Sequence, residues 1–348
     1  MKKKIKIFLA DQPVHKTTGI LKEHWETDDR FELICDPYFN PFKAEWADIT
    51  WIEWCEGSMI HASERKSDGS QLWVKGMFND FNDPGHKIPV DFIGDWYNTK
   101  LINRAIDIDV WYPQFHQVEW NNVDGLTYIA KHIFELMNEK MDFSTHYPKL
   151  KMKHIPLSID TNKFNFRDRT KTHGKNIAFV NHLWGGKGIP LALQIIKKLT
   201  EQDCGLTENQ NSNWKLYIVG DWCNEMWLQG YIRHMISEMN LDNNVIIQNR
   251  VPDVNVFLED MDYSLSTSYK EAFSLITAES MRKGLKPIIH NWIGAKDIWD
   301  SKWIWNTIDQ AVRMFLDDYH SEEYREYVLR YDKKTEIKNA DDLIFELL

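Results

Sequence analysis

Short apolar segments typical of β-strands alternate with segments of helical periodicity, and this alternation most constrains what the chain can fold into. In the first half we expect strands at 4–10 (KIKIFLA), 47–54 (ADITWIEW), 87–94 (KIPVDFIG), 125–130 (GLTYIA) and 152–157 (MKHIPL). Helical patterns fall between them, at 97–106 (YNTKLINRAI) and 131–141 (KHIFELMNEKM). The alternation predicts a mostly parallel sheet with helices on both of its faces.

The same alternation starts again after residues 158–175, a polar stretch typical of a linker. The expected strands are NIAFVN, WKLYIVGDW, NVIIQNRV and DYSLSTS, and the expected helices are 187–202, 226–240 and 254–261. A chain of 348 residues can form two domains. We therefore predict two doubly wound α/β domains, at 1–160 and 176–325, with a linker at 161–175. Residues 326–348 are expected to be helical, packing back across both domains or capping the second.

Composition and charge exclude several classes of protein. The net charge is −10, from 42 basic and 52 acidic residues, and both halves of the chain are about equally acidic. Binding of a nucleic-acid backbone needs a surface rich in Lys and Arg, and no such surface is evident in the sequence. A nucleic-acid partner is therefore disfavoured. No apolar run approaches the ~20 residues of a membrane span. We expect a cytoplasmic protein without a transmembrane segment, and peripheral association with a membrane is the alternative.

The sequence gives no support for a bound metal. Cys35, Cys55, Cys204 and Cys223 are far apart and form no CxxC pair, which is typical of a reducing compartment. The thirteen histidines are scattered and form no HExxH motif. The acidic segment at Asp107–Asp109 is interpreted as a solvated edge rather than a pair of metal ligands.

The segment 271–284, EAFSLITAESMRKG, carries two glutamates around a helix start. Glu271 lies at a strand-to-helix corner, and Glu279 lies about two turns further along. Ligands of doubly wound sheets bind outside the carboxyl ends of the strands. Glu279 is suited to accept hydrogen bonds from paired hydroxyls such as a ribose diol. Glu271 could accept hydrogen bonds from the hydroxyls of the group that is attached to a bound diphosphate. The alternative is that both merely follow the preference of helix starts for acidic residues.

A second corner between strand and helix holds Gly185, Gly186, Lys187 and Gly188. Glycines allow close approach of the backbone, a helix N-terminus offers free N–H groups, and the lysine adds a charge, so the corner suits a phosphate. The alternative is an ordinary glycine-rich connection with a surface lysine. Neither half contains GxGxxG or GxxxxGK[ST], so a standard dinucleotide site or P-loop is not predicted.

Four segments in register resemble the retaining glycosyltransferases of the GT4 family. SYKEAFSLITAESMRKGLKPII is similar to the family's E-x7-E signature, and HLWGGKGIPLALQIIKKL to its R-L-x-x-x-K-G segment. KLYIVGDW and HIPLSIDTNKF resemble its V-G-x-G strand and the entry to its linker. The resemblance covers roughly residues 150–300. It implies the GT-B fold, in which two Rossmann-like α/β domains face each other across a cleft.

The resemblance implies roles for single residues. Lys187, with Gly185 and Gly186, would bind the donor diphosphate, and Glu271 the donor sugar, which makes Lys187 and Glu271 the expected catalytic residues. The other expected donor contacts are Glu279 to the ribose, the backbone of Phe273 and Ser274 to sugar or phosphate oxygens, and Arg250 and Val251 to the nucleobase. His182 stands where the family usually has arginine, and histidine is charged only part of the time near pH 7.

The acceptor side has no matching residues. The family has a glycine-rich loop after its first strand and often a histidine in the first domain. Here the loop offers only Gly19, and His15 and His116 are candidates without a register.

The implied activity is transfer of a hexose or pentose, with retention and without a metal or further cofactor, from a nucleoside-diphosphate sugar. The acceptor would be a hydroxyl of a glycan, a lipid-linked molecule or another compound. A rival is an epimerase or a phosphorylase of the same fold. A phosphorylase would need a lysine that binds pyridoxal phosphate, and no segment of the sequence is typical of such a lysine. Two further alternatives are a nucleotide-sugar-binding protein that lacks activity and a glycosyltransferase for modified DNA bases.

Overall fold

The computed structural model describes residues 3–11, 17–54, 57–63, 98–106, 111–204, 212–223 and 225–348, and the backbone alone of residues 72–80 and 83–94. The chain divides into two compact units. The first comprises Met1–Pro156 together with Glu336–Leu348, and the second comprises Leu157–Thr335. Residues 161–175 thus belong to the second unit, and the end of the chain belongs to the first.

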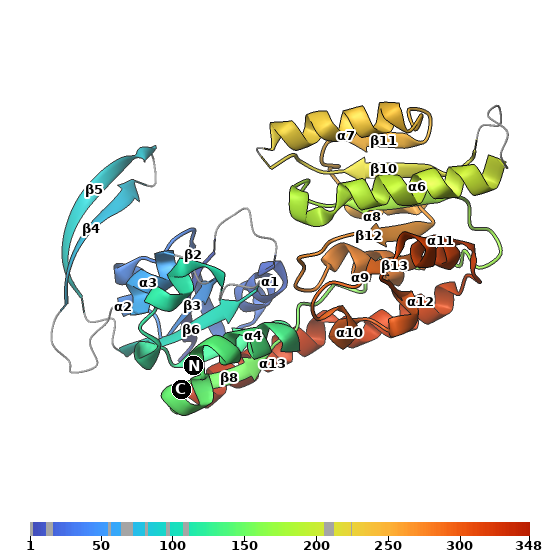
Figure 1. Cartoon of the computed structure of the whole chain (residues 1–348). Helices are drawn as coiled ribbons and strands as arrows, with labels where there is room; N and C mark the ends of the chain where they lie inside the picture. Colours follow the sequence, from blue (N-terminus) through green and yellow to red (C-terminus); the bar gives the residue numbers. More distant parts are fainter. Residues whose placement is uncertain are drawn as a thin grey trace. The chain divides into compact units, whose positions relative to one another are not determined.

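The first unit contains a sheet of six parallel strands (Figure 1). Their spatial order is β2 (Phe31–Asp36), β1 (Ile5–Ala10), β3 (Ile49–Glu53), β6 (Lys100–Ala105), β7 (Gly125–Tyr128) and β8 (Lys151–His154). The helices in this part of the chain are α1 (Gly19–Thr27), α2 (Pro41–Trp46), α3 (Gly57–Ser63), α4 (Lys131–Met141) and α5 (Phe143–His146). The predicted parallel sheet and the helix at 131–141 are confirmed.

The helix predicted at 97–106 is wrong, because Lys100–Ala105 form the strand β6. This strand is buried from Leu101 onward, as parallel strands covered on both faces commonly are. In the sequence, the spacing of the polar residues of this strand resembles the polar face of a helix, and this led to the wrong prediction. In the structure Asn103 is buried and donates from Nδ2 to the carbonyl oxygens of Ile52 (3.2 Å) and Trp54 (2.8 Å).

The strand predicted at 87–94 exists, but it does not belong to the parallel sheet. It is part of β5 (Asp83–Gly94), which pairs antiparallel with β4 (Leu72–Asp80) in a separate two-stranded sheet. A sequence pattern that predicts a strand does not identify the partner, because pairing depends on the turn and on distant surfaces.

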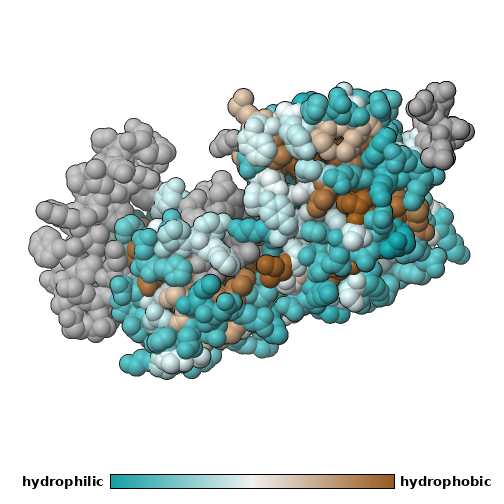
Figure 2. All heavy atoms as spheres, viewed as in Figure 1, coloured by the Kyte–Doolittle hydropathy of each residue, from teal (hydrophilic) through white to brown (hydrophobic). Residues whose placement is uncertain are grey.

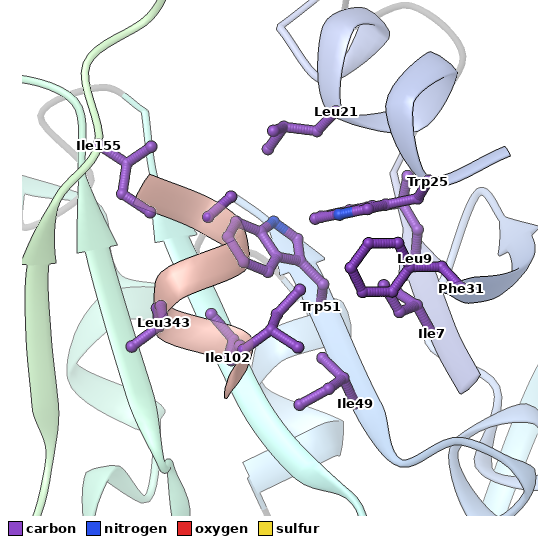
Figure 3. Close-up of a cluster of buried hydrophobic side chains, with 12 residues drawn as sticks. Ile7, Leu9, Leu21, Trp25, Phe31, Ile49, Trp51, Ile102, Ile155 and Leu343 are labelled. Carbon is purple, nitrogen blue, oxygen red and sulfur yellow. The ribbon is translucent and has the colours of Figure 1, made fainter. Parts of the chain in front are cut away.

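The core of the first unit includes the C-terminal helix α13 (Lys333–Leu347), whose residues from Glu336 onward belong to this unit. Figure 3 shows Ile7, Ile49, Trp51 and Ile102 of the sheet gathered with Leu343 of this helix. The rings of Trp25 and Trp51 meet edge to face at 5.2 Å between centroids. Large aromatic side chains bury much apolar area and dominate such packing.

Polar contacts also attach α13 to the first unit. Asp341 accepts hydrogen bonds from Arg30 Nη2 at 2.6 Å and from the indole N–H of Trp25 at 3.4 Å, and His24 Nε2 lies 3.1 Å away. Asp341 is buried, and buried carboxylates are retained where they are paired in this way.

The second unit contains another sheet of six parallel strands (Figure 1). Their order is β11 (Val245–Gln248), β10 (Lys215–Val219), β9 (Asn176–Val180), β12 (Tyr263–Ser266), β13 (Lys286–His290) and β14 (Ile304–Trp305). The chain builds this sheet outward from β9 to β11 and then restarts on the other side with β12. The order therefore reverses between β9 and β12, and such a reversal is where open α/β sheets bind ligands.

Helices cover both faces of the second sheet. α6 (Ile189–Cys204) packs against α7 (Met226–Glu238) and α11 (Ile308–Leu316), whereas α9 (Leu275–Arg282) packs against α12 (Ser321–Val328). Right-handed crossovers that leave β9 and β12 in opposite directions place α6 and α9 on opposite faces. The short helices are α8 (Val254–Phe257) and α10 (Ala295–Ile298).

On the face drawn in Figure 2, hydrophilic residues cover most of the part that is coloured by hydropathy, with smaller groups of hydrophobic residues between them. Within the described residues, no helix is both long enough and apolar enough to cross a membrane.

Candidate functional site

The residues predicted for the donor side lie at one edge of the second sheet. His182 and Gly185–Lys187 follow β9, Arg250 and Val251 follow β11, and Glu271–Ser274 follow β12. Glu279 lies in the helix α9 that comes next. Because the carboxyl ends of parallel strands meet at the same edge, segments that are far apart in the sequence come together here.

The two expected catalytic residues are in direct contact. Lys187 Nζ lies 2.7 Å from Glu271 Oε2, and the two side chains are only 14% and 15% exposed. The same carboxylate oxygen accepts a hydrogen bond from the Ser268 hydroxyl at 3.3 Å, and Glu271 Oε1 lies 3.4 Å from the backbone nitrogen of Ala272. At this edge of the sheet the ammonium of Lys187 thus lies beside the carboxylate of Glu271, which also has the hydrogen-bond donors of Ser268 and Ala272 within reach.

The loop after β12 fixes the backbone that carries Lys187. The Thr267 hydroxyl donates to the carbonyl oxygens of Lys187 (2.7 Å) and Gly188 (2.9 Å), and the Tyr269 N–H donates to Gly186 (3.1 Å). Gly188 has a φ of +64°, and a Cβ there would lie 2.2 Å from the Thr267 carbonyl oxygen. Only glycine fits this position, because both the left-handed backbone and the close contact exclude a side chain.

A third loop reaches the same corner through Glu225, a residue that no sequence motif singled out. Glu225 Oε2 accepts a hydrogen bond from the Gly185 N–H at 2.8 Å. The Tyr269 hydroxyl is also close, 3.8 Å from where a Cβ on Gly185 would be. Burial, together with the charges of Glu225 and Asp221, raises the pKa of the neighbouring Cys223 thiol. The loop after β10 therefore contributes negative charge to the corner.

The segment that follows Glu271 is held by packing and by hydrogen bonds. Phe273 is buried, and its ring packs edge to face on Tyr331 at 4.9 Å between centroids. Ser274 precedes the first residue of α9 with a φ of +71°, an unusual value for a residue other than glycine, and its hydroxyl lies 2.8 Å from that of Thr277. Helix α9 therefore begins at Leu275, between Glu271 and Glu279.

The other expected donor residues share the edge without a described contact to Lys187. His182 and Arg250 are exposed, and Val251 and Glu279 are half-buried. Their positions after β9, β11 and β12 agree with their expected roles, and those roles stay predictions.

Of the candidates in the first unit, the structure describes Gly19 and His116. Gly19 is the first residue of α1, and His116 is exposed in a 3-10 helix, Pro113–Gln117. His15 and the acidic segment at Asp107–Asp109 lie outside the described residues. In the part of the chain that the structure describes, no three His, Cys, Asp or Glu side chains are grouped as metal ligands would be.

Residues 160–302 match the model of the family described as glycosyl transferases group 1. This segment contains every expected donor residue. A comparison of the sequence with curated proteins finds no significant match.

Solved glycosyltransferase structures share the fold along the whole chain. The crystal structure of Anabaena HepE in complex with UDP matches with a TM-score of 0.68 and 11% identity, over 99% of this chain and 100% of that one. The lipopolysaccharide outer core galactosyltransferase WaaB matches with a TM-score of 0.66 and 12% identity, also over 99% and 100%. The chain has the GT-B fold.

A structure of an S. aureus TarM mutant in complex with fondaparinux, α-GlcNAc-glycerol and UDP is also similar, with a TM-score of 0.58 and 16% identity. That match covers 72% of this chain and 52% of TarM, so the chain spans about half the length of TarM. At these identities the likeness concerns the GT-B fold. The family match, together with this fold, supports a glycosyltransferase that uses a nucleotide sugar.

Proposed function

We propose that the protein transfers a sugar from a nucleoside-diphosphate sugar to an acceptor hydroxyl, with retention of configuration, as enzymes of the GT4 family do. The observation that carries the proposal is the contact between Lys187 and Glu271. Two motifs that are far apart in the sequence place a cation and a carboxylate 2.7 Å apart. The contact lies at the reversal point of the second sheet, within the segment that matches the glycosyltransferase family.

Lys187 and the backbone around it would bind the diphosphate. The lysine lies in the turn Gly185–Lys187, which Gly188 separates from the start of α6, and the free N–H groups and dipole of a helix start favour an anion. Donors that are fixed before the reaction stabilise the charge that develops on a departing diphosphate. The leaving group would thus be stabilised by the protein itself, and independence from metal is part of the proposal.

The resemblance to the GT4 family supports the remaining donor contacts. Glu271 would accept hydroxyls of the donor sugar, and Glu279 those of the ribose. The backbone of Phe273 and Ser274 would meet sugar or phosphate oxygens, and the loop at Arg250 and Val251 would lie along the nucleobase.

Transfer would proceed on one face of the sugar. The bond between the anomeric carbon and the phosphate oxygen breaks, the acceptor oxygen bonds to that carbon on the same face, and its proton passes to the departing phosphate. This route requires no covalent intermediate and no separate base, which suits a donor side where Glu271 is already paired with Lys187.

UDP sugars are the first donors to test, because similar structures contain UDP: HepE with UDP-glucose, and TarM and GtfA with UDP. The acceptor class is a hydroxyl of a glycan, a lipid-linked molecule or another compound.

A second candidate is a nucleotide-sugar-binding protein that does not catalyse transfer. The observation that favours it is the limited positive charge of the donor side. His182 occupies the place of the family's arginine and is exposed, and Lys187 is already paired with a carboxylate.

A thermal-shift screen tests the donor site. Wild type, Lys187→Ala and Glu279→Ala would be melted with UDP, GDP, ADP, CMP and their common sugars. Lys197→Ala serves as the matched control, because Lys197 lies further along α6 and pairs with Glu201. We expect one nucleotide family to stabilise wild type and the control but neither site variant.

Mass spectrometry of the reaction with that donor then separates the two candidates. Hydrolysis or transfer of the sugar supports the enzyme, and binding without turnover across an acceptor panel supports the binding protein. No shift with any nucleotide at millimolar concentration would refute the donor site.

A further inference from the structure

Among the described residues, the carboxylate of Glu225 reaches the glycine-rich corner from the loop after β10. It occupies the N-cap position of α7, yet its side chain makes no capping hydrogen bond to that helix. Instead Oε2 accepts the Gly185 N–H at 2.8 Å. The carboxylate therefore binds a different loop, although the first N–H groups of its own helix α7 belong to the residues that follow it in the chain.

The N–H that Glu225 occupies belongs to the segment expected to bind the diphosphate. Gly185 lies two residues before Lys187, within the same turn. Two donors of this turn are engaged by carboxylates, the Gly185 N–H by Glu225 and the Lys187 ammonium by Glu271. A carboxylate oxygen and a phosphate oxygen are the same kind of anionic acceptor, and charge-assisted hydrogen bonds to either are of similar strength.

A diphosphate bound at this turn would meet the negative charge of Glu225. Two anionic groups that share one donor repel each other, so one of them has to leave. Glu225 has an alternative position close by, because an acidic side chain at a helix start is stabilised by the free N–H groups and the dipole. The cost of moving it is therefore modest.

We propose that Glu225 competes with the donor's diphosphate for the Gly185 N–H and so sets the affinity of the protein for its donor. The inference rests on the proposed function, since it assigns a determinant of affinity to the same site. When the donor binds, Glu225 moves from Gly185 to the N-terminus of α7. Without the carboxylate, the N–H is available to phosphate at once.

Calorimetric titration of Glu225→Gln and Glu225→Ala tests the competition. UDP, GDP and ADP would be titrated, each beside its nucleoside, at 0.15 M salt. We expect the cognate diphosphate to bind Glu225→Ala about tenfold more tightly than wild type, because the Gly185 N–H is released. Glu225→Gln should tighten binding by a smaller factor, because glutamine loses the charge but keeps an acceptor oxygen. Binding of the nucleoside should stay unchanged, because it lacks the competing phosphates.

Asp221→Asn is the matched control. Asp221 lies in the same loop and carries the same charge, and the backbone contact of its carbonyl with the Leu183 N–H does not involve the side chain. We expect its affinity for the diphosphate to change less than about twofold, since exposed charges are screened at this salt concentration. A nitrogen-15 spectrum of the Gly185 amide should shift in Glu225→Gln, and in wild type only when the diphosphate is added.

Three results would overturn the inference. In the first, the Glu225 variants bind the diphosphate as wild type does or more weakly. In the second, Asp221→Asn tightens binding equally, so that charge alone is responsible. In the third, wild type and all variants bind no nucleotide or nucleoside, which refutes the proposed function and this inference with it. Binding by wild type that the variants leave unchanged refutes the inference alone.

Discussion

Lys187 and Glu271 are separated by 84 positions in the chain, and their charged groups meet at 2.7 Å. Each side chain is mostly buried, so the pair is screened by solvent less than a surface ion pair is. The donor diphosphate would have to replace Glu271 as the partner of Lys187, and the carboxylate would turn to the hydroxyls of the sugar. Ser268 and Ala272, which already contact Glu271, can keep it in place during this exchange.

The two partners should therefore differ in their effects when substituted. Lys187→Ala is expected to weaken binding of the nucleoside diphosphate about tenfold or more, since it removes the charged donor. Glu271→Gln should leave that binding unchanged or tighter, because it frees Lys187. It should still lower kcat about 100-fold, as the sugar loses a positioning contact. Calorimetry measures the nucleotide affinity of both variants, and initial rates measure kcat. An equal loss of nucleotide affinity in both variants would contradict the assigned roles.

Gly188→Ala should displace the backbone that carries Lys187. Its φ is +64°, and the new Cβ would lie 2.2 Å from the Thr267 carbonyl oxygen, so we expect a loss of roughly 1–3 kcal/mol. For a unit of this size that corresponds to a fall in Tm of several degrees, and donor affinity should fall as well. Gly19→Ala is the control, because no atom lies within 4 Å of a Cβ there and its Tm should be unchanged or slightly higher. An unchanged Tm in Gly188→Ala would contradict the constraint.

His182→Arg should raise the affinity for the donor, since it adds a permanent charge at the edge that holds Lys187. His182 is exposed, so the longer side chain can be accommodated. Histidine loses its charge as the pH rises through the neutral range, whereas arginine does not. The gain should therefore be larger at pH 8 than at pH 6. Titrations at both pH values check this, and a gain that does not depend on pH would argue against a role of His182 in binding phosphate.

A buried charge cluster in the first unit makes stability depend on pH. Arg104 Nη2 lies 2.6 Å from Glu336 Oε1, Arg104 Nη1 lies 3.6 Å from Glu53 Oε1, and all three side chains are buried. Burial raises the pKa of Glu53 from 4.5 to about 8, although the Arg104 charge opposes the shift. Arg104 thus lies closer to Glu336 than to Glu53, and the buried Glu53 keeps its proton to a higher pH than an exposed glutamate does.

Because the folded state holds the Glu53 proton more tightly than the unfolded chain does, the free energy of unfolding should decrease as the pH rises from about 4.5 to about 8. Glu53→Gln mimics the protonated group and should remove this slope. Urea unfolding at pH 5, 6.5 and 8 measures it, and the variant should gain more than about 1 kcal/mol relative to wild type between pH 5 and 8. Glu23→Gln, an exposed substitution on α1, is the control, and parallel pH profiles for wild type and Glu53→Gln would contradict the assignment.

Local patterns in the sequence were sufficient for much of the fold and for placing the segments of the expected donor side at one edge of the second sheet. The alternation of strands and helices predicted both parallel sheets, and the glycines around Lys187 and the strand-to-helix corner at Glu271 predicted loops at one edge. The predicted sheets and the shared edge are confirmed because they depend on short-range preferences and on one topological rule, that the carboxyl ends of parallel strands meet at the same edge. The binding of a donor at this edge stays a prediction.

Only the tertiary structure decided which distant segments meet. Lys100–Ala105 become the strand β6 because Arg104 and Asn103 find partners in the interior, and no local pattern contains those partners. The last helix returns to the first unit because Leu343 and Ile344 are buried in its core and Asp341 pairs with Arg30. Glu225 reaches Gly185 in the same way. A sequence shows what a side chain can do, but burial and pairing between strands determine what lies within its reach.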